Sequence, residues 1–175
     1  HGSQTFTEAV ENSCNPVFAT LALRLGKDTL YKYIKAFGFG TITGIDFPGE
    51  TPGRLQPFNQ VKNVEVANIG FGQGIAVTPI QMVMGVSAIA NGGSLLRPYL
   101  VKKIVSPGGK VVLENKRQVI REVVSKETSE IMRDLMRSVV TNGSGVRAYL
   151  DGLRVAGKTG TAQKVVQGRR GYSQL

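Results

Sequence analysis

The chain of 175 residues is long enough for one domain with a core, and 41% hydrophobic residues is typical of a globular rather than a disordered protein. A formal net charge of +10 suits an acidic partner such as nucleic acid, an anionic membrane surface or a carboxylate-bearing polymer. The basic residues are scattered without a run of five, so a solvated surface explains them more simply and no nucleic-acid partner is predicted.

Composition also excludes several kinds of site. Cys14 is the only cysteine, which excludes an intramolecular disulfide and a zinc site built from cysteine pairs. His1 is the only histidine, and its place at the end of the chain makes most imidazole chemistry unsuitable. We therefore expect no metal and no cofactor. No apolar run approaches the length of a membrane span, and no signal peptide is present.

The first residues predict two helices separated by a tight break. Thr5 and Glu8 have the spacing of a capping box, so a short helix is expected to begin there. Pro16 suits the first turn of a second helix, with Asn15 as its cap. The tripeptide Ser13-Cys14-Asn15 is then placed in the break between these helices.

The middle of the chain predicts two further helices and a long loop. Asp28 is a cap candidate for a helix that stops at Gly38. Residues 40–63 are rich in Gly, Pro, Thr and Asn, which is typical of a surface loop. Residues 78–81 form a second capping box, and the helix that follows to about residue 90 is apolar nearly all round, which predicts a buried central helix.

The remaining residues predict a β-hairpin, a helix and a strand. Two apolar runs, 100–105 and 110–113, flank a Ser-Pro-Gly-Gly turn. Ser125 is a cap candidate for a helix that ends at Asn142-Gly143, and a short turn or helix leads from there into a strand over residues 155–164. Because helices and strands do not alternate regularly, the order of elements predicts an α+β fold.

The strand predicted over residues 155–164 contains an unusual segment. Gly157 and Gly160 flank Lys158 and Thr159, although glycine weakens the interior of a strand. A glycine there leaves room for another backbone to lie against the strand. The segment is therefore a candidate binding edge.

Two short motifs are candidates for chemistry. Ser13-Cys14-Asn15 is a Ser-x-Asn tripeptide, and Lys158-Thr159-Gly160 is a Lys-Thr-Gly tripeptide. Taken alone, Ser13 and Asn15 are explained equally well as helix-capping residues. The predicted contexts, a helix break and a strand with glycines, are those in which the two motifs can face one cleft.

Together the motifs resemble the second and third active-site motifs of penicillin-binding proteins and serine β-lactamases. The middle residue of the second motif departs from the usual pattern, because it is Cys14 here. Three longer stretches are similar to the transpeptidase domain of class B penicillin-binding proteins, the branch of the division and elongation transpeptidases and of the stage V sporulation protein D type. These stretches are Gly72-Gln73-Gly74-Ile75-Ala76-Val77-Thr78-Pro79-Ile80-Gln81-Met82, Ala90-Asn91-Gly92-Gly93 and Gly157-Lys158-Thr159-Gly160-Thr161-Ala162-Gln163.

The resemblance covers nearly the whole chain and implies both a fold and a reaction. The fold is the penicillin-binding transpeptidase and serine β-lactamase-like α+β fold, here as a partial domain over residues 1–175. The reaction is that of a peptidoglycan D,D-transpeptidase: a serine attacks a D-Ala-D-Ala stem peptide, D-Ala leaves, and the acyl group passes to an amine of a neighbouring strand. A β-lactam mimics that peptide and traps the acyl-enzyme.

The resemblance also assigns roles to residues of this chain. Lys158 would supply positive potential for the substrate carboxylate and for proton transfer. Ser13 would relay a proton, and the side-chain amide of Asn15 would hold a substrate carbonyl. The substrate-binding residues would be those of the Lys-Thr-Gly segment that donate hydroxyl hydrogen bonds or leave backbone exposed: Thr159, Gly160 and Thr161.

One departure from the family is the absence of its nucleophile motif, because no serine of the chain has a lysine three residues later. In the family this Ser-x-x-Lys motif precedes Ser-x-Asn, so truncation is expected, with the nucleophile part and the C-terminal strands missing. Two observations agree with this: the chain begins without Met, and residues 172–175 have the pattern of a further strand. The chain alone is then expected to be inactive.

For the parent protein, the resemblance implies a membrane anchor outside this chain and a location on the extracytoplasmic face of the cell membrane. It implies peptidoglycan stem peptides and β-lactams as ligands, and membrane partners of the divisome or elongasome type. The alternatives are a non-catalytic β-lactam-binding or sensor relative, a serine β-lactamase and, less favoured, a basic nucleic-acid module.

Overall fold

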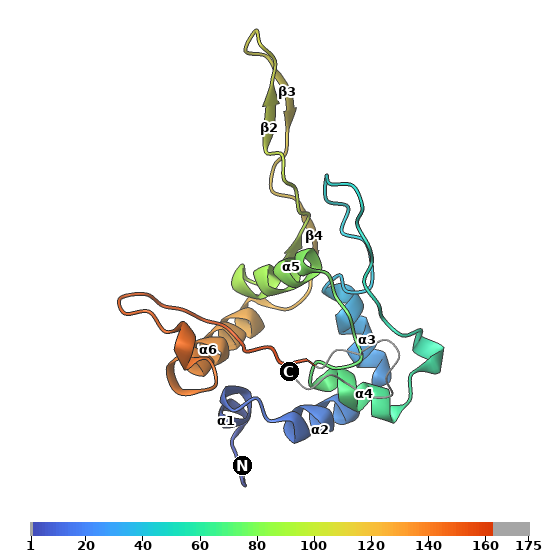
Figure 1. Ribbon diagram of the computed structural model, residues 1–175, viewed down its shortest axis with the longest axis vertical. Coiled ribbons are helices and arrows are strands. Elements are labelled where there is room, and N and C mark those ends of the chain that lie inside the picture. Colours follow the sequence, from blue (N-terminus) through green and yellow to red (C-terminus); the bar gives the residue numbers. More distant parts are fainter. Residues whose placement is uncertain (1, 163–175) are drawn as a thin grey trace, which may run out of the picture. The chain divides into compact units, whose positions relative to one another are not determined.

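The computed structural model describes residues 2–162 of the chain (Figure 1). The described residues form two compact units. The first combines residues 2–30, 56–75 and 133–162, and the second combines residues 31–55 and 76–132. None of the helices in this described part is long and apolar enough to cross a membrane.

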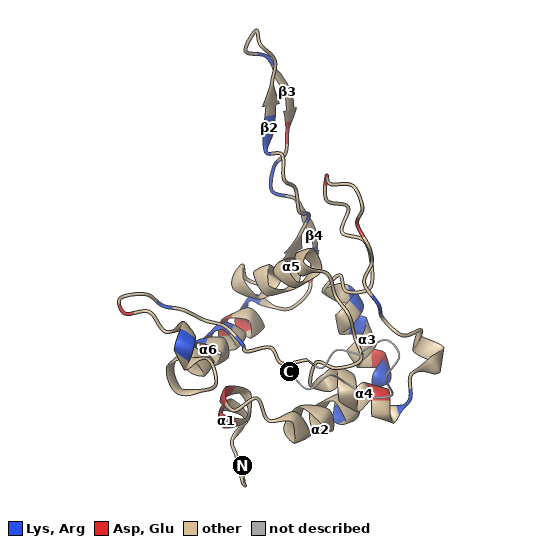
Figure 2. Ribbon diagram, viewed as in Figure 1, with Lys and Arg blue, Asp and Glu red and all other residues tan. Residues whose placement is uncertain are grey.

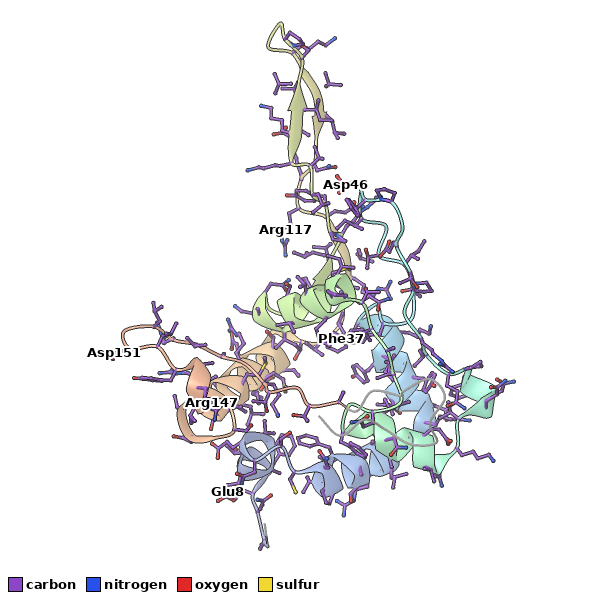
Figure 3. The ribbon with its side chains drawn as sticks, in the orientation of Figure 1. Glu8, Phe37, Asp46, Arg117, Arg147 and Asp151 are labelled. Carbon is purple, nitrogen blue, oxygen red and sulfur yellow. The ribbon has the colours of Figure 1, made fainter. Side chains whose placement is uncertain are left out.

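The first unit opens with two helices joined by a tight break, as expected. In α1 (Phe6–Glu11) the capping box is formed, because Glu8 N donates to Thr5 Oγ1 at 3.3 Å and Thr5 N donates to Glu8 Oε2 at 2.7 Å. Figure 3 shows Glu8 on this helix. The helix α2 (Asn15–Leu25) has proline in its first turn and Gly26 as its C-cap, as expected.

One detail of α2 was predicted wrongly. Asn15 is the first residue of the helix, and the capping position belongs to Cys14, whose side chain makes no capping hydrogen bond. The same shift occurs at α3 (Lys27–Ala36), where Asp28 lies inside the first turn rather than before it. In both helices the hydrogen-bonded turn begins one residue or more before the polar residue that favours a cap.

Helix α4 (Asn63–Gly70) was not predicted from the sequence. Its capping residue, Lys62, is not one that favours this position, and only the other half of a capping box is formed, in which Lys62 N donates to Glu65 Oε2 at 2.9 Å. The helix packs closely on α2, since a Cβ on Gly70 would lie 2.5 Å from Ala22 Cβ and 2.7 Å from Phe18 O. The short 3₁₀ helix Phe58–Gln60 precedes α4.

The second unit contains α5 (Pro79–Ala90) and two antiparallel strand pairs. Strand β1 (Ser94–Leu96) pairs with β4 (Val119–Glu122), with Ser94 opposite Glu122. The predicted hairpin is confirmed as β2 (Lys103–Val105) and β3 (Val111–Glu114). The helices together with antiparallel strand pairs confirm the α+β class. A buried hydrophobic cluster of this unit consists of Met84, Ala88, Leu95 and Val123.

Helix α5 also holds the long loop that the composition predicted. Its buried Gln81 donates through Nε2 to Thr41 O at 2.7 Å and to Pro52 O at 2.9 Å. Between these two anchored residues, Asp46 accepts hydrogen bonds from Leu100 N and Val101 N, which ties the loop to the base of the hairpin (Figure 3). These backbone donors lower the pKa of the Asp46 carboxyl.

The expectation that α5 is buried on all sides is wrong for the described residues. Met84 and Ala88 are buried, but Met82 is 48% exposed and Val83 is 59% exposed. The helix meets its core along one face only, and its apolar residues on the other face contact little within its unit. An apolar pattern around a whole helix does not show which faces are covered.

Helix α6 (Lys126–Asn142) is capped by Ser125, whose Oγ accepts from Thr128 N at 3.1 Å, as expected. A short 3₁₀ helix, Val146–Ala148, follows. The strand predicted over residues 155–164 is not formed within residues 155–162, where no residue belongs to a strand or a bridge. A strand requires hydrogen bonds to a neighbouring strand, and the described residues supply none there. Residues 163–164 and the strand predicted at 172–175 lie outside the described residues.

Candidate active site

The Ser-x-Asn motif begins in a strained turn at the end of α1. Ser13 has φ 53° and is the only residue other than glycine with a positive φ in the described part of the chain. Its N donates to Val10 O at 3.2 Å, and Cys14 N donates to Ala9 O at 2.9 Å. These two bonds form a Schellman motif, in which Ser13 takes the left-handed position that ends the helix.

The end of α4 provides a direct comparison with this turn. There Gly72 N donates to Ile69 O at 3.0 Å and Gln73 N donates to Asn68 O at 2.9 Å. Gly72 has φ 89° and fills the position that Ser13 fills in α1. Because a Cβ makes the left-handed conformation about 1–2 kcal/mol less favourable, glycine is the residue that this turn favours. A serine at this position keeps its hydroxyl at that steric cost, which makes Ser13 a candidate functional residue.

Asn15 lies next to this turn. It is exposed in the first turn of α2, immediately after the half-buried Cys14. The Cys14 carbonyl accepts from Val17 N at 3.1 Å and Phe18 N at 3.2 Å, so the backbone of the tripeptide is tied into both helices. The motif therefore forms a corner whose backbone is held by both helices, and Asn15 in it is exposed.

The Lys-Thr-Gly segment presents an ammonium group and hydroxyls on open backbone. Lys158 Nζ donates to Thr159 Oγ1 at 3.2 Å and to Thr159 O at 3.3 Å. The Lys158 side chain as a whole is exposed, and partial desolvation of its ammonium lowers its pKa from the ordinary value of 10.5. A Cβ on Gly160 would meet no atom within 4 Å, so one face of the segment is open. Thr161 is exposed beside it.

One small cluster connects the two motifs. Glu11 stands two residues before Ser13, and its carbonyl accepts from Ser144 N at 2.9 Å. Its carboxylate accepts from Ser138 Oγ. Ser144 Oγ in turn lies 2.9 Å from Thr159 Oγ1, within hydrogen-bond distance. The end of α1 and the Lys-Thr-Gly segment are thus both attached to the end of α6.

Two close approaches hold this cluster together. A Cβ on Gly143 would lie 2.6 Å from Glu11 O, so only glycine allows the chain after α6 to pass α1 this closely. Gly157 N donates to Met136 O at 3.0 Å, which fixes the start of the Lys-Thr-Gly segment against α6.

The residues of this cluster were not predicted from the sequence. Gly143 was interpreted only as the end of a helix, and Glu11, Ser138 and Ser144 were not singled out. The sequence offers one weak indication of this cluster. Ser144 comes directly after a glycine that ends a helix, and the hydroxyl-bearing Lys-Thr-Gly segment follows further along the chain.

The arrangement suits recognition of an anion with an extended backbone. An ammonium group and a hydroxyl at Lys158 and Thr159 match a carboxylate, and the open face at Gly160 accommodates a peptide-like ligand.

Lys and Arg are spread over many elements of the chain rather than gathered in one segment (Figure 2). Residues 2–162 contain no group of three or more His, Cys, Asp or Glu side chains placed to hold a metal ion.

Comparison with known proteins agrees with the resemblance seen in the motifs. Residues 1–175 match the family model of the penicillin binding protein transpeptidase domain. Stage V sporulation protein D of Bacillus subtilis is 51% identical over 170 residues, which is 97% of this chain and 26% of that protein. The peptidoglycan D,D-transpeptidase FtsI homolog of Mesostigma viride is 32% identical over 183 residues, which is 95% of this chain and 30% of that protein.

A solved structure shows the same fold. The crystal structure of penicillin binding protein 3 from Mycobacterium tuberculosis, complexed with ampicillin, superposes with a TM-score of 0.90 at 35% sequence identity. The match covers 97% of this chain and 39% of that one. The chain therefore spans roughly a quarter of the length of the curated relatives, for which the shares are 26% and 30%.

Proposed function

Because the chain belongs to the penicillin-binding protein transpeptidase domain family, in its class B branch, we propose that it is part of a peptidoglycan D,D-transpeptidase. The substrate is a stem peptide that ends in D-Ala-D-Ala, and β-lactams acylate the same site. The attacking serine is not one of the serines of this chain, since none lies in a Ser-x-x-Lys motif. The chain alone is therefore expected to show no turnover.

In this proposal the Lys-Thr-Gly segment binds the terminal carboxylate of the donor peptide. The Lys158 ammonium supplies positive charge, and the Thr159 hydroxyl supplies a hydrogen bond to the same carboxylate. The open face at Gly160 lets the ligand backbone lie along the segment as an added strand, and Thr161 donates a further hydrogen bond to the peptide.

The corner that follows α1 serves the other side of the ligand. The Ser13 hydroxyl, held in the strained turn, relays a proton between the leaving group and the catalytic centre. The side-chain amide of the exposed Asn15 donates to the carbonyl of the substrate amide. Two hydrogen-bonding motifs on opposite sides orient the scissile bond, which contributes to catalysis by positioning.

The observation that carries the proposal is the link between the two motifs. Glu11, just before the Ser-x-Asn corner, bonds Ser144 through its backbone, and Ser144 lies 2.9 Å from the Thr159 hydroxyl. Motifs far apart in the sequence are thereby fixed to one cluster, as a shared active site requires.

The test is covalent labelling of the full-length protein with a fluorescent penicillin. We expect rapid labelling of the unmodified protein and greatly reduced labelling of the Lys158→Ala variant. Lys103→Ala is the matched control, since Lys103 is an exposed lysine of the hairpin strand β2 and should not alter labelling. Unchanged labelling of Lys158→Ala would show that this lysine is structural.

A second measurement separates transpeptidation from related activities. The full-length protein should release D-Ala from a D-Ala-D-Ala peptide and form a cross-linked product when an acceptor amine is present. Labelling without release would indicate a sensor, and rapid loss of the label would indicate a β-lactamase; either result would contradict the proposal.

We further propose that the parent protein works on the extracytoplasmic face of the cell membrane, with membrane partners of the divisome or elongasome type. The support is the peptidoglycan D,D-transpeptidase activity named for one relative, the FtsI homolog of Mesostigma viride. Protease accessibility of the domain in intact spheroplasts tests the location, and protection from added protease would contradict it.

A further inference from the structure

Building on the function just proposed, we propose that Ser144 is a positioning residue that directs the Thr159 hydroxyl toward the carboxylate of the ligand. Ser144 follows the glycine that ends α6, and its Oγ lies 2.9 Å from Thr159 Oγ1. It is not part of either active-site motif.

The argument rests on the hydrogen-bonding capacity of one hydroxyl. The Thr159 side chain has one O–H to donate and two lone pairs that accept. Lys158 Nζ donates to Thr159 Oγ1 at 3.2 Å and occupies one lone pair. If Ser144 donates to the other, both acceptor positions are filled. The Thr159 proton is then left for a third partner, and a ligand carboxylate is the acceptor that fits.

Either Ser144 or Thr159 can be the donor in this pair. Without a ligand, Thr159 is free to donate to Ser144. When a carboxylate binds, Thr159 donates to it and Ser144 becomes the donor to Thr159. Ser144 therefore keeps the Thr159 side chain in one rotamer in both states and only the direction of the shared proton changes.

The position of Ser144 does not depend on its own hydroxyl. Its backbone N donates to Glu11 O at 2.9 Å, and the close approach of Gly143 to Glu11 fixes the chain just before it. A Ser144→Ala variant keeps both of these contacts and loses only the bond to Thr159. That substitution therefore tests the hydroxyl rather than the fold.

The experiment compares benzylpenicillin with its methyl ester on the full-length protein. For Ser144→Ala we expect about three- to ten-fold weaker reversible binding of benzylpenicillin, as expected for one neutral hydrogen bond, with the rate of the acylation step unchanged. The methyl ester lacks the carboxylate, so the substitution should not alter its binding. Ser144→Thr should restore the binding of benzylpenicillin.

Two further variants sharpen the test. In a Thr159→Val background, Ser144→Ala should have no additional effect, because the partner hydroxyl is already absent. Ser138→Ala removes the hydroxyl that contacts the Glu11 carboxylate in the same cluster but does not touch Thr159. It should leave the preference for benzylpenicillin over the ester unchanged.

If Ser144→Ala lowers the affinity for benzylpenicillin and for its ester equally, Ser144 has a purely structural role and the inference is overturned. The inference is also overturned if the substitution lowers the affinity for neither compound. If the unmodified full-length protein fails to react with benzylpenicillin, the proposed function itself fails. If it reacts and Ser144→Ala behaves like the unmodified protein, only the positioning role fails.

Discussion

Ser13→Gly should stabilise the folded protein and at the same time abolish the β-lactam acylation that we propose for the full-length protein. Ser13 has φ 53° at the left-handed position that ends α1, while the equivalent position at the end of α4 is Gly72 with φ 89°. Glycine adopts this conformation without the steric cost of a Cβ. Its lack of a side chain also removes the proposed proton relay.

The expected gain in stability is small but measurable. Relief of the left-handed conformation contributes about 1–2 kcal/mol to the free energy of unfolding. The greater freedom of glycine in the unfolded chain offsets about 0.4–1 kcal/mol of this. The net gain is therefore between about 0 and 1.6 kcal/mol. Ser13→Ala retains a Cβ in the same turn and should leave the stability near that of the unmodified protein.

The assay is urea unfolding of the full-length protein followed by circular dichroism, together with the rate of penicillin labelling. Both variants should lose labelling, and only the glycine variant should shift to a higher urea midpoint. A glycine variant less stable than the alanine variant would refute the strain argument. Normal labelling of either variant would refute the catalytic role of Ser13.

Three further predictions concern the glycines and the lysine. Gly160→Ala should leave the free energy of unfolding unchanged, because no atom lies within 4 Å of the added Cβ. The same Cβ should reduce the rate of penicillin labelling, because it obstructs the backbone of the ligand. Gly108→Ala is the control: its added Cβ is equally free of contacts, and it should change neither quantity. Gly70→Ala should lower the free energy of unfolding by about 1–3 kcal/mol, because its Cβ would lie 2.5 Å from Ala22 Cβ; an unchanged urea midpoint would contradict this packing. Partial desolvation lowers the pKa of Lys158 from 10.5, so the ammonium should lose its charge below that pH. The affinity for carboxylate ligands should therefore fall as the pH rises through the lowered pKa. A binding titration in which the affinity stays unchanged up to pH 10.5 would contradict this prediction.

The elements predicted correctly from the sequence depend on contacts between near neighbours in the chain. The capping boxes of α1 and α5 each join two residues three positions apart; in α1 these are Thr5 and Glu8. The hairpin β2–β3 is likewise specified by its own turn. Local patterns of this kind are visible in a single sequence because both partners fall within one short window.

The elements that were missed depend on contacts across long separations. Strand β1 is short and pairs with β4, with Ser94 opposite Glu122, and no local pattern indicates that pairing. At the start of helix α4 the cap residue Lys62 offers no side-chain acceptor, although Glu65 Oε2 accepts from Lys62 N, and the helix packs through Gly70 against α2. The strand expected at the Lys-Thr-Gly segment failed for the same reason, since a strand exists only where a partner strand accepts its hydrogen bonds.

For the candidate site, the sequence by itself determined which chemical groups are present. The motifs around Ser13 and Lys158 could be recognised because each is a short run of adjacent residues. Only the tertiary structure decided how they are held: Glu11 binds Ser144, and Ser144 reaches the hydroxyl of Thr159. The physical reason is that these hydrogen bonds join residues distant in the chain, and such bonds form only after the backbone has folded.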